Sequence, residues 1–259
     1  MGIHQSFCVP ILRDLGGLTR DELYRALSDI GYEAVEIWGR GEDFDELVET
    51  AKKHGLVVAS MCGHASLGDG LNKPENHDRI ESELTESIDL AVRHGIPGLI
   101  CFSGNRNPGQ SDYEGLVECA RVLRRIAPYA QDQSVNLNVE LLNSKVDHPL
   151  YQCDRTGWGV ALCEMVNSPR VKLLFDIYHM QIMEGDVIRS LQKAIGWIGH
   201  FHTAGNPGRQ DLDDAQELNY RGICRAISDT GYGLYLGHEF RPKGGCVDAA
   251  RAAFAVCDV

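Results

Sequence analysis

The sequence predicts a (β/α)8 barrel, formed by a single domain that spans residues 1–259. Short apolar runs rich in Val, Ile, Leu and Phe alternate with amphipathic stretches along the whole chain. Strands separated by helices pair in parallel through right-handed crossovers, which is typical of α/β proteins. Eight strand-like runs in a chain of 259 residues favour a closed barrel of the usual size. A doubly wound open sheet is the alternative.

The predicted strands are short apolar runs bounded by turn residues, a pattern typical of buried parallel strands. They cover Ile3–Cys8, Glu33–Ile37, Leu56–Met61, Gly98–Ser103, Val135–Leu141, Val171–Asp176, Trp197–His202 and Leu234–Glu239. The clearest helical patterns between them are Thr19–Ile30, Pro74–His94 and Asp112–Gln131. Several helices are followed by a glycine, as expected at a helix C-terminus.

The composition excludes several classes of protein. The 37 acidic residues outnumber the 25 Lys and Arg residues, and the net charge of −12 disfavours binding to nucleic acid or to an anionic membrane surface. No apolar run has the length of a transmembrane helix. Nine cysteines, with no Cys-x-x-Cys pair, favour reduced thiols and a cytoplasmic location. No glycine-rich phosphate-binding motif is present, so we expect no nucleotide cofactor.

Potential metal ligands end four consecutive predicted strands. They are Glu140 on the fifth strand, Asp176 on the sixth, His202 on the seventh and Glu239 on the eighth. The carboxyl ends of barrel strands converge at the catalytic mouth, where three clustered carboxylates require a cation. Three oxygen ligands and one imidazole suit Mn²⁺ or Mg²⁺ better than a structural Zn²⁺. The alternative, in which each residue separately caps a helix or pairs with an arginine, does not require this coincidence.

Four further residues follow predicted strands and are candidate substrate contacts. His179 lies three residues after Asp176, and Arg209 follows the seventh strand in the sequence Asn-Pro-Gly-Arg. An arginine there is suited to holding a carboxylate or hydroxyl of the substrate. His64 and Arg106 follow the third and fourth strands and are weaker candidates. The alternative for each is a structural histidine or a surface arginine.

Several motifs resemble the hydroxypyruvate isomerase family, which belongs to the xylose-isomerase-like TIM barrels. The segments that carry the resemblance are Phe175–Asp186, Gly199–His202, Asn206–Arg209, Glu217–Tyr220, Glu140–Asn143, Gly237–Pro242, Gln5–Ser6 and Cys101–Arg106. The resemblance covers most of the chain and is strongest from Glu140 to Pro242. It identifies the superfamily more specifically than the substrate.

The resemblance implies a metal held by two Glu, one Asp and one Gln or His. Glu140 and Glu239 would double as the acid/base pair, and His179 and Arg209 would contact the substrate. One position departs from the family pattern. Hydroxypyruvate isomerases and the similar 2-oxo-tetronate isomerases commonly carry Gln at the third ligand, where this sequence has His202. Histidine at this position is common in the ketose 3-epimerases, whose motifs after the seventh strand otherwise differ.

The leading hypothesis is that the protein is a metal-dependent isomerase of a small hydroxy-carbonyl compound and that the reaction passes through an enediolate. An example of such a reaction is the interconversion of hydroxypyruvate and tartronate semialdehyde. A ketose 3-epimerase and a 2-oxo-tetronate isomerase are alternatives, and a homo-oligomer is compatible with each. Two other classes remain. A metal-dependent endonuclease needs more metal ligands and a basic groove, which the acidic charge opposes. A non-catalytic sugar-binding barrel is opposed by the intact glutamate pair.

Overall fold

The computed structural model describes residues 2–41 and 43–259. Its strands follow one another in sequence order in a closed parallel barrel, which confirms the predicted (β/α)8 fold. The strands are β1 (His4–Cys8), β2 (Ala34–Glu36), β3 (Val57–Cys62), β4 (Gly98–Cys101), β5 (Asn136–Glu140), β6 (Val171–Asp176), β7 (Ile198–Thr203) and β8 (Tyr235–His238).

The predicted strands are all present, and no boundary differs from the prediction by more than two residues. The sixth coincides with β6, whereas β4 ends two residues before the predicted limit of Ser103. Glu239 lies one residue beyond β8, and its backbone N–H still donates to the carbonyl of Thr203 on β7 at 3.0 Å. The extra hydrogen bond keeps Glu239 aligned with the end of β7.

In the described chain each strand is followed by one α-helix, except that two α-helices follow β6. The α-helices are α1 (Arg20–Ile30), α2 (Phe44–Lys53), α3 (His77–His94), α4 (Asp112–Asp132), α5 (Thr156–Val166), α6 (Ile177–Met183), α7 (Val187–Ala194), α8 (Tyr220–Ser228) and α9 (Cys246–Cys257). None of the described helices is long and apolar enough to cross a membrane.

Two of the three clearest predicted helices begin at a side-chain N-cap, and the third begins later than predicted. Thr19 and Ser111 cap α1 and α4, and in each case a glutamate three residues later completes a capping box. The predicted helix Pro74–His94 is divided, because residues Pro74–Asn76 form a separate 3-10 turn before α3.

The chain forms two compact units. Unit 1 comprises Met1–Met61 and Phe201–Val259, and unit 2 comprises Cys62–His200. The prediction of one domain over the whole chain stays a prediction.

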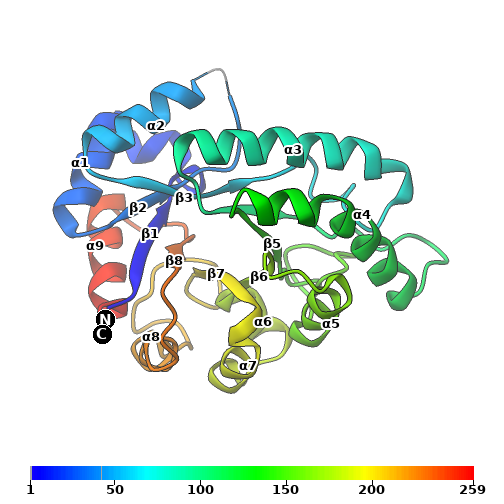
Figure 1. Cartoon of the computed structure of the whole chain (residues 1–259). Helices are drawn as coiled ribbons and strands as arrows, with labels where there is room; N and C mark the ends of the chain where they lie inside the picture. The colour runs from blue at the N-terminus through cyan, green and yellow to red at the C-terminus, as the bar shows by residue number, and fades with distance from the viewer. Residues whose placement is uncertain (1, 42) are drawn as a thin grey trace. The chain divides into compact units, whose positions relative to one another are not determined.

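In unit 1, β1 pairs with both β2 and β8, and β7 pairs with β8. Helix α1 packs beside α2 and α9, and α8 packs beside α9 (Figure 1). The buried strands and these helices form the core of the unit.

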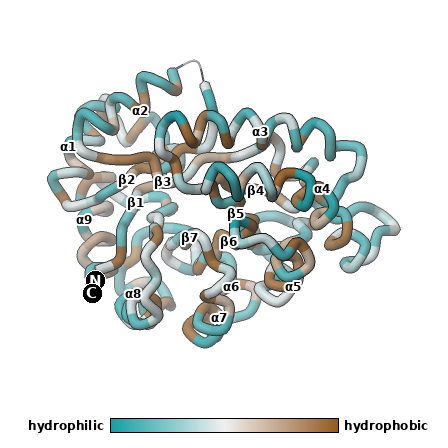
Figure 2. Tube along the Cα trace, viewed as in Figure 1, coloured by the Kyte–Doolittle hydropathy of each residue, from teal (hydrophilic) through white to brown (hydrophobic). Residues whose placement is uncertain are grey.

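In unit 2, β5 pairs with β4 and β6, and α4 packs beside α3 and α5. Figure 2 shows both hydrophilic and hydrophobic segments along α3 and α4, as expected for helices that bury one face. Leu84 and Ile88 on α3 and Leu123 on α4 are fully buried. Full burial of such a side chain contributes about 1.5–3 kcal/mol, so this packing holds the strands of the unit in place.

Candidate active site

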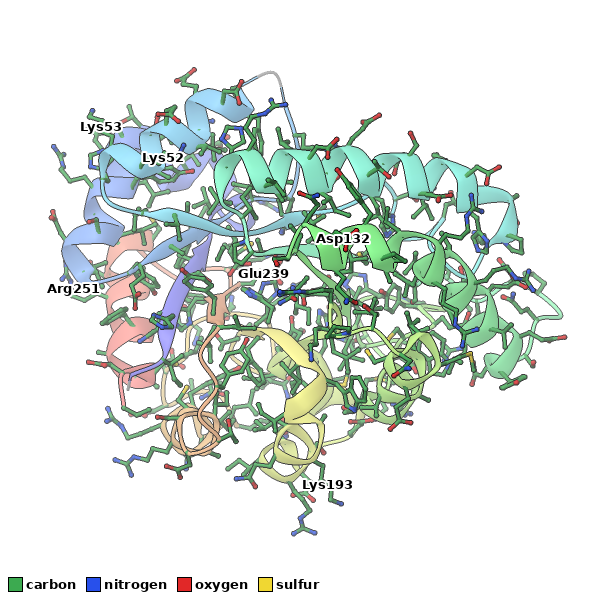
Figure 3. The ribbon with its side chains drawn as sticks, viewed as in Figure 1. Lys52, Lys53, Asp132, Lys193, Glu239 and Arg251 are labelled. Atoms are coloured by element: carbon green, nitrogen blue, oxygen red, sulfur yellow. The ribbon has the colours of Figure 1, made fainter. Side chains whose placement is uncertain are left out.

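Two of the predicted metal ligands lie in unit 1, at the ends of β7 and β8. His202 on β7 is opposite Gly237 on β8, and this register brings His202 Nδ1 within 3.3 Å of Glu239 Oε2. Both side chains are buried. In Figure 3, the labelled Glu239 lies at the inner end of β8, whereas Lys52 and Lys53 lie on the outer helix α2. The strand pairing of unit 1 therefore brings these two predicted ligands together.

The Glu239 carboxylate has further neighbours in unit 1. Arg209 Nη2 donates to Glu239 Oε2, and Cys8 Sγ lies 3.7 Å from the other oxygen, Oε1. The Arg209 backbone adopts a positive φ of 54°, and its carbonyl accepts a hydrogen bond from the Arg241 N–H at 2.8 Å. Because the guanidinium compensates a buried carboxylate, Arg209 is held at the predicted ligand Glu239.

Glu36, which the sequence analysis did not single out, contacts His202 directly. Its side chain is almost fully buried, and its Oε2 lies 2.9 Å from His202 Nε2. The Ser6 hydroxyl donates to the other oxygen, Oε1, at 2.5 Å. Glu36 is the last residue of β2, just as Glu140 is the last residue of β5. The rule of looking for ligands at strand ends, applied to the second strand, would have found it.

The other two predicted ligands lie in unit 2, where Glu140 ends β5 and Asp176 ends the adjacent strand β6. Both are buried, at 5% and 1% exposure. Asp176 Oδ1 accepts a hydrogen bond from the His179 backbone N–H at 3.0 Å, which caps α6. Asp176 Oδ2 lies 3.6 Å from His179 Nε2. The cap thus fixes Asp176 and places the imidazole of His179 beside it.

The network around Asn143 in unit 2 determines the protonation of His179. Asn143 Oδ1 accepts from the backbone N–H groups of Val146 and Asp147, at 3.0 and 2.9 Å. The Asn143 amide nitrogen must therefore be the group that faces His179 Nδ1, at 2.6 Å, and it donates there. Because Nδ1 accepts, the proton of the neutral ring is on Nε2. His179 thus presents a hydrogen-bond donor on the side of Asp176.

His64, a predicted substrate contact, has backbone partners for both ring nitrogens. Its Nε2 accepts from the Phe102 N–H at 2.9 Å, and Nδ1 lies 3.1 Å from the carbonyl oxygen of Ala65. Burial lowers the pKa of His64 to about 4, so the ring is neutral at pH 7. These contacts connect the residues after β3 to the end of β4, and the predicted contact with substrate stays a prediction.

Arg106, the other weaker candidate, joins two loops of unit 2. Its guanidinium lies 3.1 Å from carboxylate oxygens of both Asp112 and Asp154, and it donates to the carbonyls of Tyr151 and Gln152. The side chain is about a third exposed. These partners give Arg106 a role in holding the loop before α5, and its predicted contact with substrate likewise stays a prediction.

A family model described as xylose isomerase-like TIM barrel matches residues 24–255. The chain belongs to this family. A putative hydroxypyruvate isomerase from Homo sapiens is 28% identical over 235 residues, covering 86% of this chain and 84% of that protein. A 2-oxo-tetronate isomerase from Cupriavidus necator is 35% identical over 153 residues, covering 59% and 55% of the two chains. The predicted resemblance to xylose-isomerase-like barrels is confirmed.

A solved structure of this barrel type is also similar over its full length. The crystal structure of AP endonuclease, family 2, from Brucella melitensis superposes with a TM-score of 0.86 at 24% identity and covers 100% of both chains. At this level of identity the likeness shows the fold alone and carries no statement on activity.

Proposed function

We propose that this protein is an isomerase of a small hydroxy-carbonyl compound, such as hydroxypyruvate, and that Glu140, Asp176, His202 and Glu239 hold one divalent metal ion for this reaction. The observation that carries the proposal is that four consecutive strands each have, within one residue of their carboxyl end, a buried residue able to offer one ligand atom. The carboxyl ends of the strands of a (β/α)8 barrel form the active-site mouth. The names of the relatives, hydroxypyruvate isomerase and 2-oxo-tetronate isomerase, agree with this reaction class.

The chemistry of the donor set fits a hard divalent ion. Three buried carboxylates are costly without positive charge nearby, and one imidazole adds a neutral ligand. Oxygen-rich sets of this kind suit Mn²⁺ or Mg²⁺. A bound ion would polarise the substrate carbonyl and stabilise negative charge that develops on oxygen.

The glutamate pair supplies the proton transfer in this proposal. One of the two carboxylates, Glu140 or Glu239, accepts the proton from the carbon next to the carbonyl and then, as the carboxylic acid, returns it to the neighbouring carbon. The other carboxylate moves the hydroxyl proton between the two substrate oxygens. His179 donates from Nε2 to a substrate oxygen, as its contact with Asn143 favours. Arg209, which lies at Glu239, binds the carboxylate of a hydroxy-keto acid through its fork of N–H donors. No nucleotide cofactor takes part.

A ketose 3-epimerase is the second candidate, and His202 is the residue that favours it. Both reactions remove a proton next to a carbonyl and differ in where it returns. An isomerase returns it to the neighbouring carbon, whereas an epimerase returns it to the same carbon from the opposite face. A metal-dependent endonuclease is opposed by the net charge of −12.

A panel of 2-oxo acids, aldoses and ketoses tests the proposal. The purified protein is stripped with a chelator, reloaded with Mn²⁺ or Mg²⁺, and assayed for conversion by mass spectrometry and NMR. We expect metal-dependent turnover of a short hydroxy-carbonyl compound and loss of turnover on chelation. Conversion of a ketose to its 3-epimer would select the second candidate. Metal binding without turnover of any compound would instead favour a non-catalytic barrel.

A further inference from the structure

We propose that Glu36 is a positioning residue that fixes the tautomer and orientation of His202, so that Nδ1 is the imidazole atom presented to the metal ion. The inference rests on the proposed function above, because it assigns His202 as a ligand. All of the residues that carry it lie in unit 1.

The strand register places Glu36 and His202 on the same interior layer. The strands lie in the order β7, β8, β1, β2, and His202 is opposite Gly237, which is opposite Ser6. Ser6 in turn is opposite Ala34 on β2. Alternate residues of a strand point to the same face, so Glu36 shares the face of Ala34. It lies two residues closer to the carboxyl end of β2. Its side chain therefore reaches His202 across two intervening strands.

Gly237 makes room for this reach. A Cβ atom at Gly237 would lie 1.8 Å from Glu36 Oε1 and 3.0 Å from His202 Cδ2. The first distance is impossible unless the Glu36 carboxylate moves, and the second is a tight contact. The absence of a side chain on β8 is thus a condition for the Glu36–His202 contact, which explains the glycine in the sequence Leu-Gly-His-Glu at the end of β8.

The hydrogen bonds of Glu36 define which nitrogen of His202 carries the proton. The Ser6 hydroxyl donates to Oε1, and Oε2 lies 2.9 Å from His202 Nε2. We take Glu36 to be ionised: its carboxylate then only accepts, so Nε2 is the donor and the proton of a neutral ring is on Nε2. Nδ1 then keeps its lone pair, and it is the nitrogen that faces Glu239, 3.3 Å away. Arg209 donates to the same Glu239 oxygen, so this contact does not need a proton on Nδ1.

A carboxylate behind a metal-ligating histidine orients the ring and increases its basicity, and mutation of such a partner typically costs 10–100-fold in metal affinity. In Glu36→Gln, the Ser6 hydroxyl favours the amide oxygen, which turns the amide NH2 toward His202 Nε2. An amide donor there favours the tautomer protonated on Nδ1, which cannot bind a metal through that atom.

The first test measures the affinity for Mn²⁺ by titration calorimetry. We expect Glu36→Gln to weaken binding about 10- to 100-fold. The matched control is Glu33→Gln, because the Glu33 carboxylate also contacts a histidine, with Oε2 2.7 Å from His4 Nδ1 on β1. Both of these side chains are about half exposed, unlike Glu36 and His202. That control should bind Mn²⁺ with wild-type affinity. Equal affinities of wild type and Glu36→Gln would overturn the inference.

The second test reads the tautomer directly in metal-free protein at neutral pH. Long-range ¹H–¹⁵N NMR spectra, assigned with a His202→Gln variant, should show the His202 proton on Nε2 in wild type and a shift toward Nδ1 in Glu36→Gln. A proton on Nδ1 in the wild type would overturn the inference whether or not metal binds. If Glu36→Gln does not fold, Ser6→Ala retains the carboxylate and should cause a smaller loss of affinity. Absence of Mn²⁺ binding to the wild type would contradict the proposed function instead.

Discussion

His64 and His202 are both buried histidines near the end of a barrel strand, yet their ring nitrogens contact different kinds of group. Those of His64 contact the backbone of Ala65 and Phe102, whereas those of His202 lie next to the carboxylates of Glu36 and Glu239. Backbone partners hold a loop in place. Carboxylate partners keep an imidazole basic and in one orientation, which is what a metal ligand needs.

The two candidate arginines differ in where their partners lie. Arg106 contacts two carboxylates and two backbone carbonyls on loops, whereas Arg209 contacts the strand-end carboxylate of Glu239. All four residues lie at or shortly after the carboxyl end of a barrel strand. The partners of the side chain therefore separate the residues we propose for function from those that position loops.

The largest expected effect is at the glutamate pair. Glu140→Gln and Glu239→Gln should each lower kcat by about 10²- to 10⁴-fold, because each removes a group that accepts a proton, while Gln retains one oxygen for the metal. Turnover is measured on the substrate found in the panel, with Glu33→Gln as the exposed control. In D₂O, the variant that retains the abstracting carboxylate should still exchange the substrate α-proton. Near-wild-type kcat in either variant with metal bound would reduce that glutamate to a ligand.

Loss of an imidazole ligand should have the next largest effect. One divalent ion per chain is expected, and Mn²⁺ at 100 times its Kd should stabilise the wild type by about 3 kcal/mol. His202→Ala should lose most of this gain, His179→Ala much less, and His64→Ala none of it. Thermal unfolding with and without Mn²⁺ measures the shift. An equal Mn²⁺-induced shift in His202→Ala and wild type would remove His202 from the ligand set.

The strands and the candidate metal ligands could be predicted from the sequence. Each strand is a short apolar run, and the active site of a (β/α)8 barrel lies at the carboxyl ends of its strands, which directs attention to the last residues of each run. Glu36 illustrates what was missed: its place at the end of β2 could be read from the sequence, but its partner could not. Its contact with His202 depends on the register of β7, β8, β1 and β2 and on the space above Gly237, neither of which appears in local sequence patterns. His64 and Arg106 were chosen by position alone, and their backbone partners depend on loop conformation that a single sequence does not specify.

Replacing the two arginines should separate binding from stability. Arg209→Ala is expected to lower kcat/KM for an acidic substrate by about 10-fold or more, since it removes a charge-assisted contact to the carboxylate. Arg106→Ala is expected to lower the free energy of unfolding by about 2 kcal/mol, through loss of hydrogen bonds to charged and carbonyl groups. Steady-state kinetics and denaturant unfolding measure the two effects. A kinetic defect in Arg106→Ala with unchanged stability would reverse the assignment.

The smallest expected effect concerns the pH dependence of stability. Burial lowers the pKa of His64 to about 4 in the folded protein, against about 6.5 for an unperturbed histidine. Between these values the unfolded chain binds more protons than the folded one, so the free energy of unfolding falls as the pH decreases from 6.5 to 4. One such group contributes a slope of up to about 1 kcal/mol per pH unit.

His64→Gln should make this slope shallower, because glutamine does not titrate and its amide offers both an acceptor for the Phe102 N–H and a donor for the Ala65 carbonyl. The slope should not vanish, since burial also lowers the pKa of His238, to about 3, and that residue remains. Denaturant unfolding of chelator-treated protein at pH 7, 6 and 5 gives the slope for both proteins. An unchanged slope would mean that the His64 ring gains a proton in the folded protein as readily as in the unfolded chain. The Phe102 N–H contact would then have to break on acidification, because a protonated Nε2 cannot accept a hydrogen bond. His64 would in that case not be held neutral by its surroundings, and its proposed difference from His202 would be contradicted.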